Sequence, residues 1–180
     1  PGQLTYRAQD TDSETSIASV PVRADALAYL VSEDTTYFGG QAPPPPFRHR
    51  IRLDHLKAAT TYAYRVDQGT SHFSATFNTA PIADEPIRFI AYADCETEPE
   101  STGKFTEWIH PLRPPDGLAK TYLLDQTTGY AQNLAAISDR HPNFIAIAGD
   151  LVESGGEQRD WDEFWRHITS LDGQESLASG

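Results

Sequence analysis

The sequence predicts a β-sandwich domain over residues 1–80, followed by an α/β domain over residues 86–180. Residues 61–77 alternate polar and apolar side chains, which is the two-residue period of half-buried antiparallel strands. Residues 87–93 and 144–148 are instead nearly continuous apolar runs, typical of parallel strands that are covered on both faces. Between the two patterns, the non-periodic stretch NTAPIADEP predicts a domain boundary.

Composition limits the classes of function that these domains can have. The 180 residues, 38% hydrophobic and 22% charged, are enough to bury a core. A net charge of -12, with only 14 Lys and Arg, argues against binding to nucleic acid or to an anionic membrane, and no apolar stretch approaches the length of a membrane span. A single cysteine excludes an internal disulfide and a Cys-rich zinc site. Because the chain begins at Pro1 and has no methionine, we expect a mature or partial product that is secreted or periplasmic.

The first half contains several short runs that resemble strands. QLTYRA and DALAYLVS have β-like patterns, at residues 3–8 and 25–32. DQGTS, at 67–71, supplies turn residues between the two alternating runs and predicts a β-hairpin. APPPPF, at 42–47, is a short polyproline II stretch, which we interpret as a rigid loop between strands.

The second half has the order strand, helix, strand. Tyr130, Leu134 and Ile137 lie at helical spacing between the two apolar runs. Thr127 or Thr128 is a candidate cap for this helix, and Pro142 ends it. A right-handed crossover of this kind lays the two strands parallel, about 4.8 Å apart if they are neighbours.

Both predicted strands lead into an aspartate, in AYADCE and in FIAIAGDLVESGG. Asp94 and Asp150 would then emerge side by side at the carboxyl edge of the sheet, where open α/β folds bind their ligands. Two carboxylates that close repel each other unless a proton or a cation lies between them, and two metals about 3.5 to 4 Å apart would make a phosphoryl-transfer site. The alternative is that Asp150 caps the next helix or begins a turn.

The first domain resembles a fibronectin type III-like domain over roughly residues 1–80. The stretch LKAATTYAYRV, residues 56–66, is similar to the approach to the penultimate strand of that family. Tyr62 stands where the tyrosine of the family's corner motif would lie.

AYADCE and FIAIAGDLVESGG resemble the first two metal-binding blocks of the calcineurin-like metallophosphoesterases, and a fibronectin-like domain ahead of them is the arrangement of the purple acid phosphatase branch. The resemblance implies that the second domain is the first part of an α/β metallophosphoesterase sandwich. It also implies that Asp94 binds one metal, that Asp150 bridges two, and that the reaction is hydrolysis of a phosphate ester. The cofactors would be two divalent or trivalent ions, Mn, Fe, Zn or Mg.

The sequence departs from the family pattern in two ways near these aspartates. The first block usually reads Asp-x-His or Asp-x-Gly, and Glu96 stands at the third place here. Glu96 either replaces the histidine as an oxygen ligand, which favours Mn²⁺ or Mg²⁺ over Zn²⁺, or it is solvated or caps the loop. Purple enzymes carry a metal-bound tyrosine where this chain has Glu153, so we expect no iron-tyrosinate site.

The family's later ligands, an Asn-His block and a final His-x-His pair, are missing. The six histidines include no His-x-His and none follows an asparagine: His49, His55, His72, His110, His141 and His167. We interpret His110 and His141 as loop residues. Trp161, Phe164, Trp165 and Ile168 form an apolar helical face, which makes the neighbouring His167 a helix-surface residue. We therefore expect a fragment of a longer enzyme, with no phosphatase activity of its own.

Three further expectations concern Cys95, the polar insertion and an alternative function. Cys95 is predicted to be packed rather than nucleophilic, because two metals would activate water without a thiol. The polar insertion 97–120 is predicted to form one wall of the cleft, with Trp108 anchoring the loop. The alternative function is a non-catalytic secreted adhesion or assembly module with a degenerate metallophosphoesterase-like domain. The sequence leaves open the metals, the choice between monoester and diester substrates, and the oligomeric state.

Overall fold

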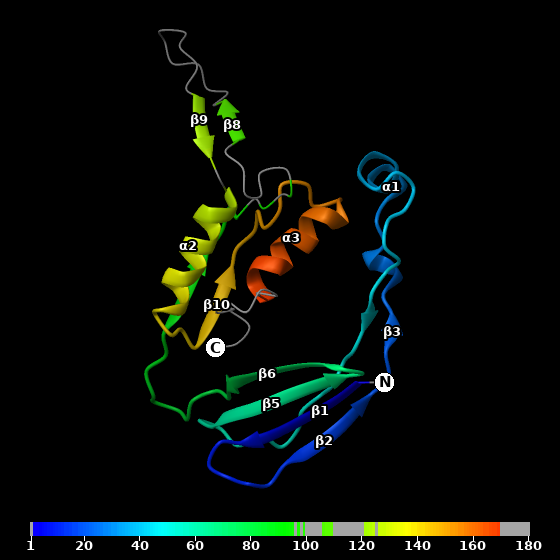
Figure 1. The fold of residues 1–180 in the computed structure, drawn as a ribbon. Coiled ribbons are helices and arrows are strands. Elements are labelled where there is room, and N and C mark those ends of the chain that lie inside the picture. Colours follow the sequence, from blue (N-terminus) through cyan, green and yellow to red (C-terminus); the bar gives the residue numbers. More distant parts are fainter. Residues whose placement is uncertain are drawn as a thin grey trace.

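The computed structural model describes residues 2–95, 97, 99, 106–109, 121–124 and 126–169. The first half of the chain is rich in antiparallel strands, and the second half combines parallel strands with helices. Figure 1 shows the antiparallel sheet below the α/β part. A connecting arm, formed by residues 22–48, rises from the sheet to the helices. No helix in these ranges is long and apolar enough to span a membrane.

The antiparallel sheet contains four strands in the order β2-β1-β5-β6. Their bounds are Gly2–Ala8 for β1, Thr15–Ser19 for β2, Thr61–Gln68 for β5 and Ser71–Asn78 for β6. The predicted hairpin is confirmed: β5 and β6 pair from Thr61 and Asn78 to Gln68 and Ser71, and Gly69 begins the two-residue loop with φ +60°. In register, Leu4 lies opposite Ile17 on one side and Val66 on the other, so apolar side chains share one face.

Tyr62 has the environment that the corner motif predicts. The amide of Lys57 donates a hydrogen bond to the Tyr62 hydroxyl oxygen over 3.0 Å. The Tyr62 ring is buried and stacks on Phe77, with 5.4 Å between the ring centroids. The tyrosine therefore ties the segment that enters β5 to the apolar face of the sheet.

The connecting arm contains one helix, where the sequence predicted a strand. The two-stranded ladder of β3 (Val22–Arg23) and β4 (Phe47–Arg48) leads to a 3₁₀ turn, η1 (Asp25–Leu27), and to helix α1 (Val31–Tyr37). The predicted strand at 25–32 is therefore wrong. The reason is a capping interaction: the side chain of Glu33 accepts a hydrogen bond from the amide of Leu30 over 2.7 Å, which satisfies an amide at the start of α1.

The second half has the predicted order of strand, helix and strand. Strand β7 (Phe89–Tyr92) pairs with β10 (Phe144–Ile147) in parallel, with Phe89 opposite Phe144, and helix α2 (Gln126–Ser138) connects them. Helix α2 begins before Thr127 and Thr128, so neither is its N-cap, and it ends ahead of Pro142 as predicted.

Two further elements belong to the α/β half. Helix α3 (Gln158–Thr169) follows β10. Within the polar insertion, β8 (Thr106–Ile109) and β9 (Thr121–Leu124) form an antiparallel pair in which Trp108 lies opposite Tyr122. The predicted role of the Trp108 side chain, like most of the insertion, lies outside what the structure describes.

Two hydrogen bonds fix the amino ends of the parallel strands. The Asn143 amide donates to the Arg88 carbonyl oxygen over 2.7 Å, and the Arg88 amide donates to Oδ1 of Asn143, also over 2.7 Å. This reciprocal pair sets the register in which Phe89 meets Phe144.

Helices α2 and α3 cover one face of this sheet. Their buried residues, with Cys95, form the core cluster: Tyr130, Leu134, Ile137 and Phe164. Ile90, Tyr92, Ile145 and Ile147 of the strands pack against it. On the opposite face Phe89 and Phe144 stack with 5.2 Å between ring centroids but remain 57% and 49% exposed. Only one face is therefore covered within the described part of the chain, where the sequence predicted two.

Candidate functional site

Asp94 and Asp150 lie at the same edge of the sheet, immediately beyond the carboxyl ends of β7 and β10. The hydrogen-bonded ladder continues past both strands: the Ala148 amide donates to the Tyr92 carbonyl oxygen over 2.9 Å, and the Asp94 amide donates to that of Gly149 over 3.2 Å. The Cys95 amide then donates to the Asp150 carbonyl oxygen over 2.7 Å. The predicted placement of both aspartates at one edge of the sheet is confirmed, but they do not face each other: Asp94 lies opposite Gly149, and Asp150 lies opposite Cys95. The closeness of their carboxylates stays a prediction.

Both aspartates have left-handed backbone conformations, with φ +57° at Asp94 and φ +47° at Asp150. Gly149, between β10 and Asp150, has φ +129°, a region that essentially only glycine occupies. A left-handed non-glycine residue costs about 1 to 3 kcal/mol, although aspartate tolerates it better than most residues. Four further non-glycine residues of the described chain are also left-handed, namely His55, Ala59, Asp84 and His141, so the conformation alone does not distinguish this edge.

The two carboxylates are exposed, and neither has a side-chain hydrogen bond or ion pair to the described residues. Asp150 does not cap the following helix, because α3 begins only at Gln158. That part of the structure uses a different carboxylate: buried Asp160 accepts a hydrogen bond from the Ser154 amide over 2.8 Å. Within the described ranges, no side-chain contact therefore occupies either aspartate.

Two of the three predicted metal ligands, Asp94 and Asp150, lie in the described part of the chain. No group of three or more His, Cys, Asp or Glu side chains comes together in the ranges that the structure describes. Glu96, the third predicted ligand, lies outside those ranges. Asp94 and Asp150 are the donors that can be placed, and carboxylate oxygens suit Mg²⁺, Mn²⁺ and Fe as well as Zn²⁺.

Two hydroxyl groups and one thiol, those of Tyr92, Tyr130 and Cys95, form a cluster next to Asp94. The hydroxyls of Tyr92 and Tyr130 are 3.1 Å apart, and Cys95 is buried beside them in the core cluster. Burial raises the pKa of all three groups; in Tyr130 the hydrogen bonds with Tyr92 and Cys95 raise it further, and in Cys95 the nearby charge of Asp94 also raises it. The thiol and the phenols therefore stay protonated at neutral pH, and the prediction that Cys95 is packed is confirmed.

A pocket of about 320 Å³ adjoins Asp94 between β7 and α2. Its strand wall runs from Ile90 to Cys95, and its helix wall runs from Tyr130 to Ile137. The lining is mainly apolar, with the two phenols, Asn133 and Asp94 as its polar groups. No pattern in the sequence indicates this pocket, because it depends on how α2 packs against β7.

His167 is not the helix-surface residue that the sequence predicted. Its side chain is only 11% exposed, its Nε2 lies 3.3 Å from Oε1 of Glu163, and its ring meets Tyr130 edge to face with 5.2 Å between centroids. Burial lowers the pKa of His167 even though Glu163 opposes the shift. We therefore interpret His167 as a neutral residue that donates a hydrogen bond to Glu163 and packs at the edge of the core.

The remaining histidines do not approach the aspartates through any described contact. His141 follows α2 as an exposed loop residue, as predicted. His110 lies outside the described residues.

No protein-family model matches the chain, and no curated protein is significantly similar to it.

Proposed function

We propose that this chain is part of a metal-dependent phosphoric ester hydrolase, of the calcineurin-like metallophosphoesterase kind, in which Asp94 binds one metal and Asp150 bridges two. In this proposal the antiparallel sheet belongs to a fibronectin type III-like sandwich, and β7, α2 and β10 begin the metallophosphoesterase sandwich. The observation that carries the proposal is the pair of exposed, left-handed aspartates on neighbouring parallel strand ends.

The surroundings of the two aspartates support a cation at this position. Both side chains lie at the ends of neighbouring strands, and neither has a side-chain partner in the described part of the chain. When bound, two metals would supply Lewis acidity toward the phosphoryl oxygens and would lower the pKa of a water molecule. The chain itself holds the carboxylates in place through the hydrogen bonds that join Asp94 to Gly149 and Cys95 to Asp150.

The pocket beside Asp94 would accommodate the organic part of the ester. The amide of Asn133 can offer hydrogen bonds there, and the protonated phenols of Tyr92 and Tyr130 add no negative charge near the phosphate. Asp94 and Asp150 alone cannot complete two metal shells, so Glu96 and donors from a longer polypeptide belong to the proposal. A secreted or periplasmic location is also part of it.

The test is the metal content of the complete polypeptide carrying Asp150→Asn. The substitution keeps the shape of the side chain and removes its charge, so bound Mn, Fe or Zn should fall by more than about tenfold in elemental analysis, together with hydrolysis of chromogenic phosphate esters. Asp84→Asn is the matched control, because Asp84 is also exposed and left-handed, with φ +75°, but lies in the linker.

Metal content that is equal in the Asp150→Asn variant and in the unaltered protein would contradict the proposal. Absence of bound metal and of hydrolysis in both would support the non-catalytic adhesion or assembly module instead. A loss of metal in Asp84→Asn as well would show that the measurement reports general misfolding.

A further inference from the structure

Glu33 of α1 caps a helix in the other half of the chain. It is a carboxylate with no exposed surface. Its Oε1 accepts a hydrogen bond from the Arg159 amide in the first turn of α3 over 2.9 Å, while its Oε2 accepts the one from Leu30. A carboxylate in this place satisfies a helix amide and interacts favourably with the helix dipole. We propose that Glu33 is a positioning residue: by capping α3, it holds the loop that carries Asp150.

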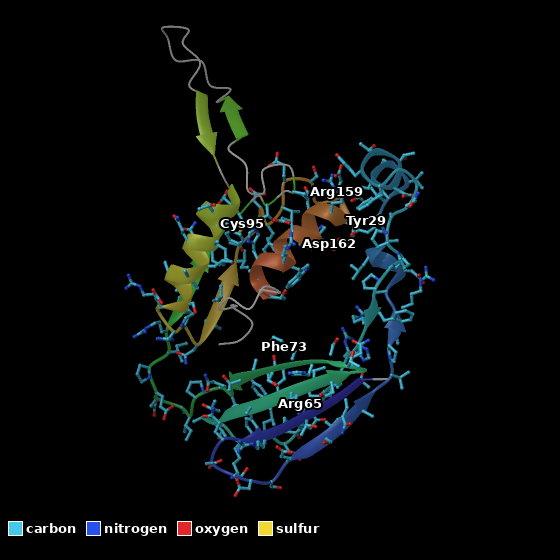
Figure 2. The ribbon with its side chains drawn as sticks, viewed as in Figure 1. Tyr29, Arg65, Phe73, Cys95, Arg159 and Asp162 are labelled. Atoms are coloured by element: carbon cyan, nitrogen blue, oxygen red, sulfur yellow. The ribbon has the colours of Figure 1, made fainter. Side chains whose placement is uncertain are left out.

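Two further contacts, each made by a tyrosine of the arm, join the arm to α3. The Arg159 guanidinium lies over the Tyr37 ring, 3.3 Å from its centroid, and the Tyr29 hydroxyl donates to Oδ2 of Asp162 over 2.5 Å. Figure 2 shows Tyr29, Arg159 and Asp162 gathered where the connecting arm meets α3. Burial, with the hydrogen bond to Asp162, raises the pKa of Tyr29 to about 12, so this donor keeps its proton at neutral pH. The arm is thus attached to α3 by several independent contacts.

The first turn of α3 is in turn bonded to the loop before it. Asp160 accepts from the Ser154 amide, and Nε1 of Trp161 donates to the Gly155 carbonyl oxygen over 2.9 Å. The Glu157 amide donates to the Ser154 carbonyl oxygen over 2.9 Å. Because Asp160 and Trp161 directly follow Arg159 in the helix, fraying of this turn would release both of their contacts with the loop.

The other end of the loop is held by the segment after β7. The Thr97 amide donates to the Leu151 carbonyl oxygen over 3.3 Å, and the Glu153 amide donates to that of Thr97 over 3.4 Å. Residues 150–157 are therefore fixed on one side by the Asp94 segment and on the other by α3. Loss of the Glu33 cap would loosen one of these two supports and leave the other.

The experiment is amide hydrogen exchange of the 180-residue chain, read by mass spectrometry. In Glu33→Ala, peptides covering 149–161 should exchange about five- to tenfold faster, the factor expected when a helix cap is lost, while peptides of β5 and β6 keep their rates. Glu33→Gln retains one acceptor oxygen and should give a smaller increase. Glu14→Gln, at an exposed carboxylate 3.9 Å from Arg7, is the control and should change nothing in 149–161.

Unchanged exchange at 149–161 in Glu33→Ala, or an equal increase over the whole chain, would overturn the proposal. If Glu33→Ala does not fold, Glu33→Gln decides: it removes one of the two acceptor oxygens that bind the Leu30 and Arg159 amides, and it should speed exchange at 149–161 but not in β5 and β6. Only the consequence for metal rests on the proposed function, and it is measured separately as the Mn²⁺ affinity of the complete polypeptide. One outcome separates the two proposals: faster exchange at 149–161 in Glu33→Ala, with no Mn²⁺ binding in the variant or in the unaltered polypeptide. It would support Glu33 as a positioning residue and would count against the metal site.

Discussion

The Cys95 amide donates a hydrogen bond to the Asp150 carbonyl oxygen over 2.7 Å, while the Cys95 thiol is buried in the core cluster. One residue therefore connects the hydrophobic core to the backbone of both candidate metal ligands, because it directly follows Asp94. The two carboxylates are held by main-chain bonds to a packed residue, so their relative position depends on core packing as well as on the loops around them.

The first prediction separates the roles of the two aspartates. If Asp94 binds one metal and Asp150 bridges two, Asp94→Asn in the complete polypeptide should lose about half of the bound metal, whereas Asp150→Asn should lose nearly all of it. Elemental analysis of dialysed protein gives the ratio. Equal losses in the two variants would refute this division of roles.

The second prediction concerns Gly149. An added Cβ would meet nothing within 4 Å, so any effect of Gly149→Ala comes from its φ of +129° rather than from a clash. The free energy of unfolding should fall by about 1 to 3 kcal/mol. Gly129→Ala is the matched control: this glycine also has open space around it but lies within α2, so alanine should stabilise by about 0.5 to 1 kcal/mol. Urea denaturation measures both, and a neutral Gly149→Ala would argue against backbone strain at the site.

The third prediction tests which aromatic residue of α3 belongs to the core. Phe164 is 2% exposed and Trp165 is 53% exposed, although they are neighbours in the sequence. Phe164→Ala should destabilise by about 3 to 5 kcal/mol, because it leaves a cavity. Trp165→Ala should cost about 1 kcal/mol or less. The order of the urea midpoints checks the assignment, and a reversed order would contradict it.

The fourth prediction follows from the lowered pKa of His167. Since burial holds this pKa below the ordinary value of 6.5, the unfolded chain binds a proton at a higher pH than the folded chain does. The free energy of unfolding should therefore decrease as the pH falls from about 6.5 toward the folded pKa, and this contribution is absent above 6.5. Urea midpoints between pH 7.5 and 5.5 measure it. His167→Gln should reduce the pH dependence, and an identical slope in the variant would exclude His167 as its source.

The parallel strand pair and the placement of Asp94 and Asp150 were predictable because they depend on local pattern and chain direction. Two unbroken apolar runs, with apolar residues at helical spacing between them, permit few arrangements, and a parallel pair brings both carboxyl ends to one edge. The hydrogen bond that the Tyr62 hydroxyl accepts is also local in the sequence, since its donor, the Lys57 amide, is only five residues away.

Helix α1 and the environment of His167 were not predictable from apolar periodicity. Helix α1 depends on Glu33, whose second hydrogen bond goes to Arg159, 126 residues away. In α3 the most buried stripe includes two carboxylates, Asp160 and Glu163, beside Phe164 and His167. A search for apolar residues assigns such a stripe to solvent, because the groups that make burial of the two carboxylates favourable are polar. Asp160 accepts from the Ser154 amide, and Glu163 lies near Arg166 and His167 of the same helix.

The reciprocal bonds between Arg88 and Asn143 have a consequence for the timing of biosynthesis. The two residues are 55 positions apart, whereas β5 and β6 meet across a two-residue loop. A nascent chain can thus close the β5–β6 hairpin as soon as it emerges, but β7 has to wait for α2 and β10. At the usual 5 to 20 residues per second, that wait is roughly 3 to 11 s over these 55 residues. During this interval Ile90 and Tyr92 have no helix residues to pack against, so β7 leaves the ribosome with its core-facing side chains uncovered.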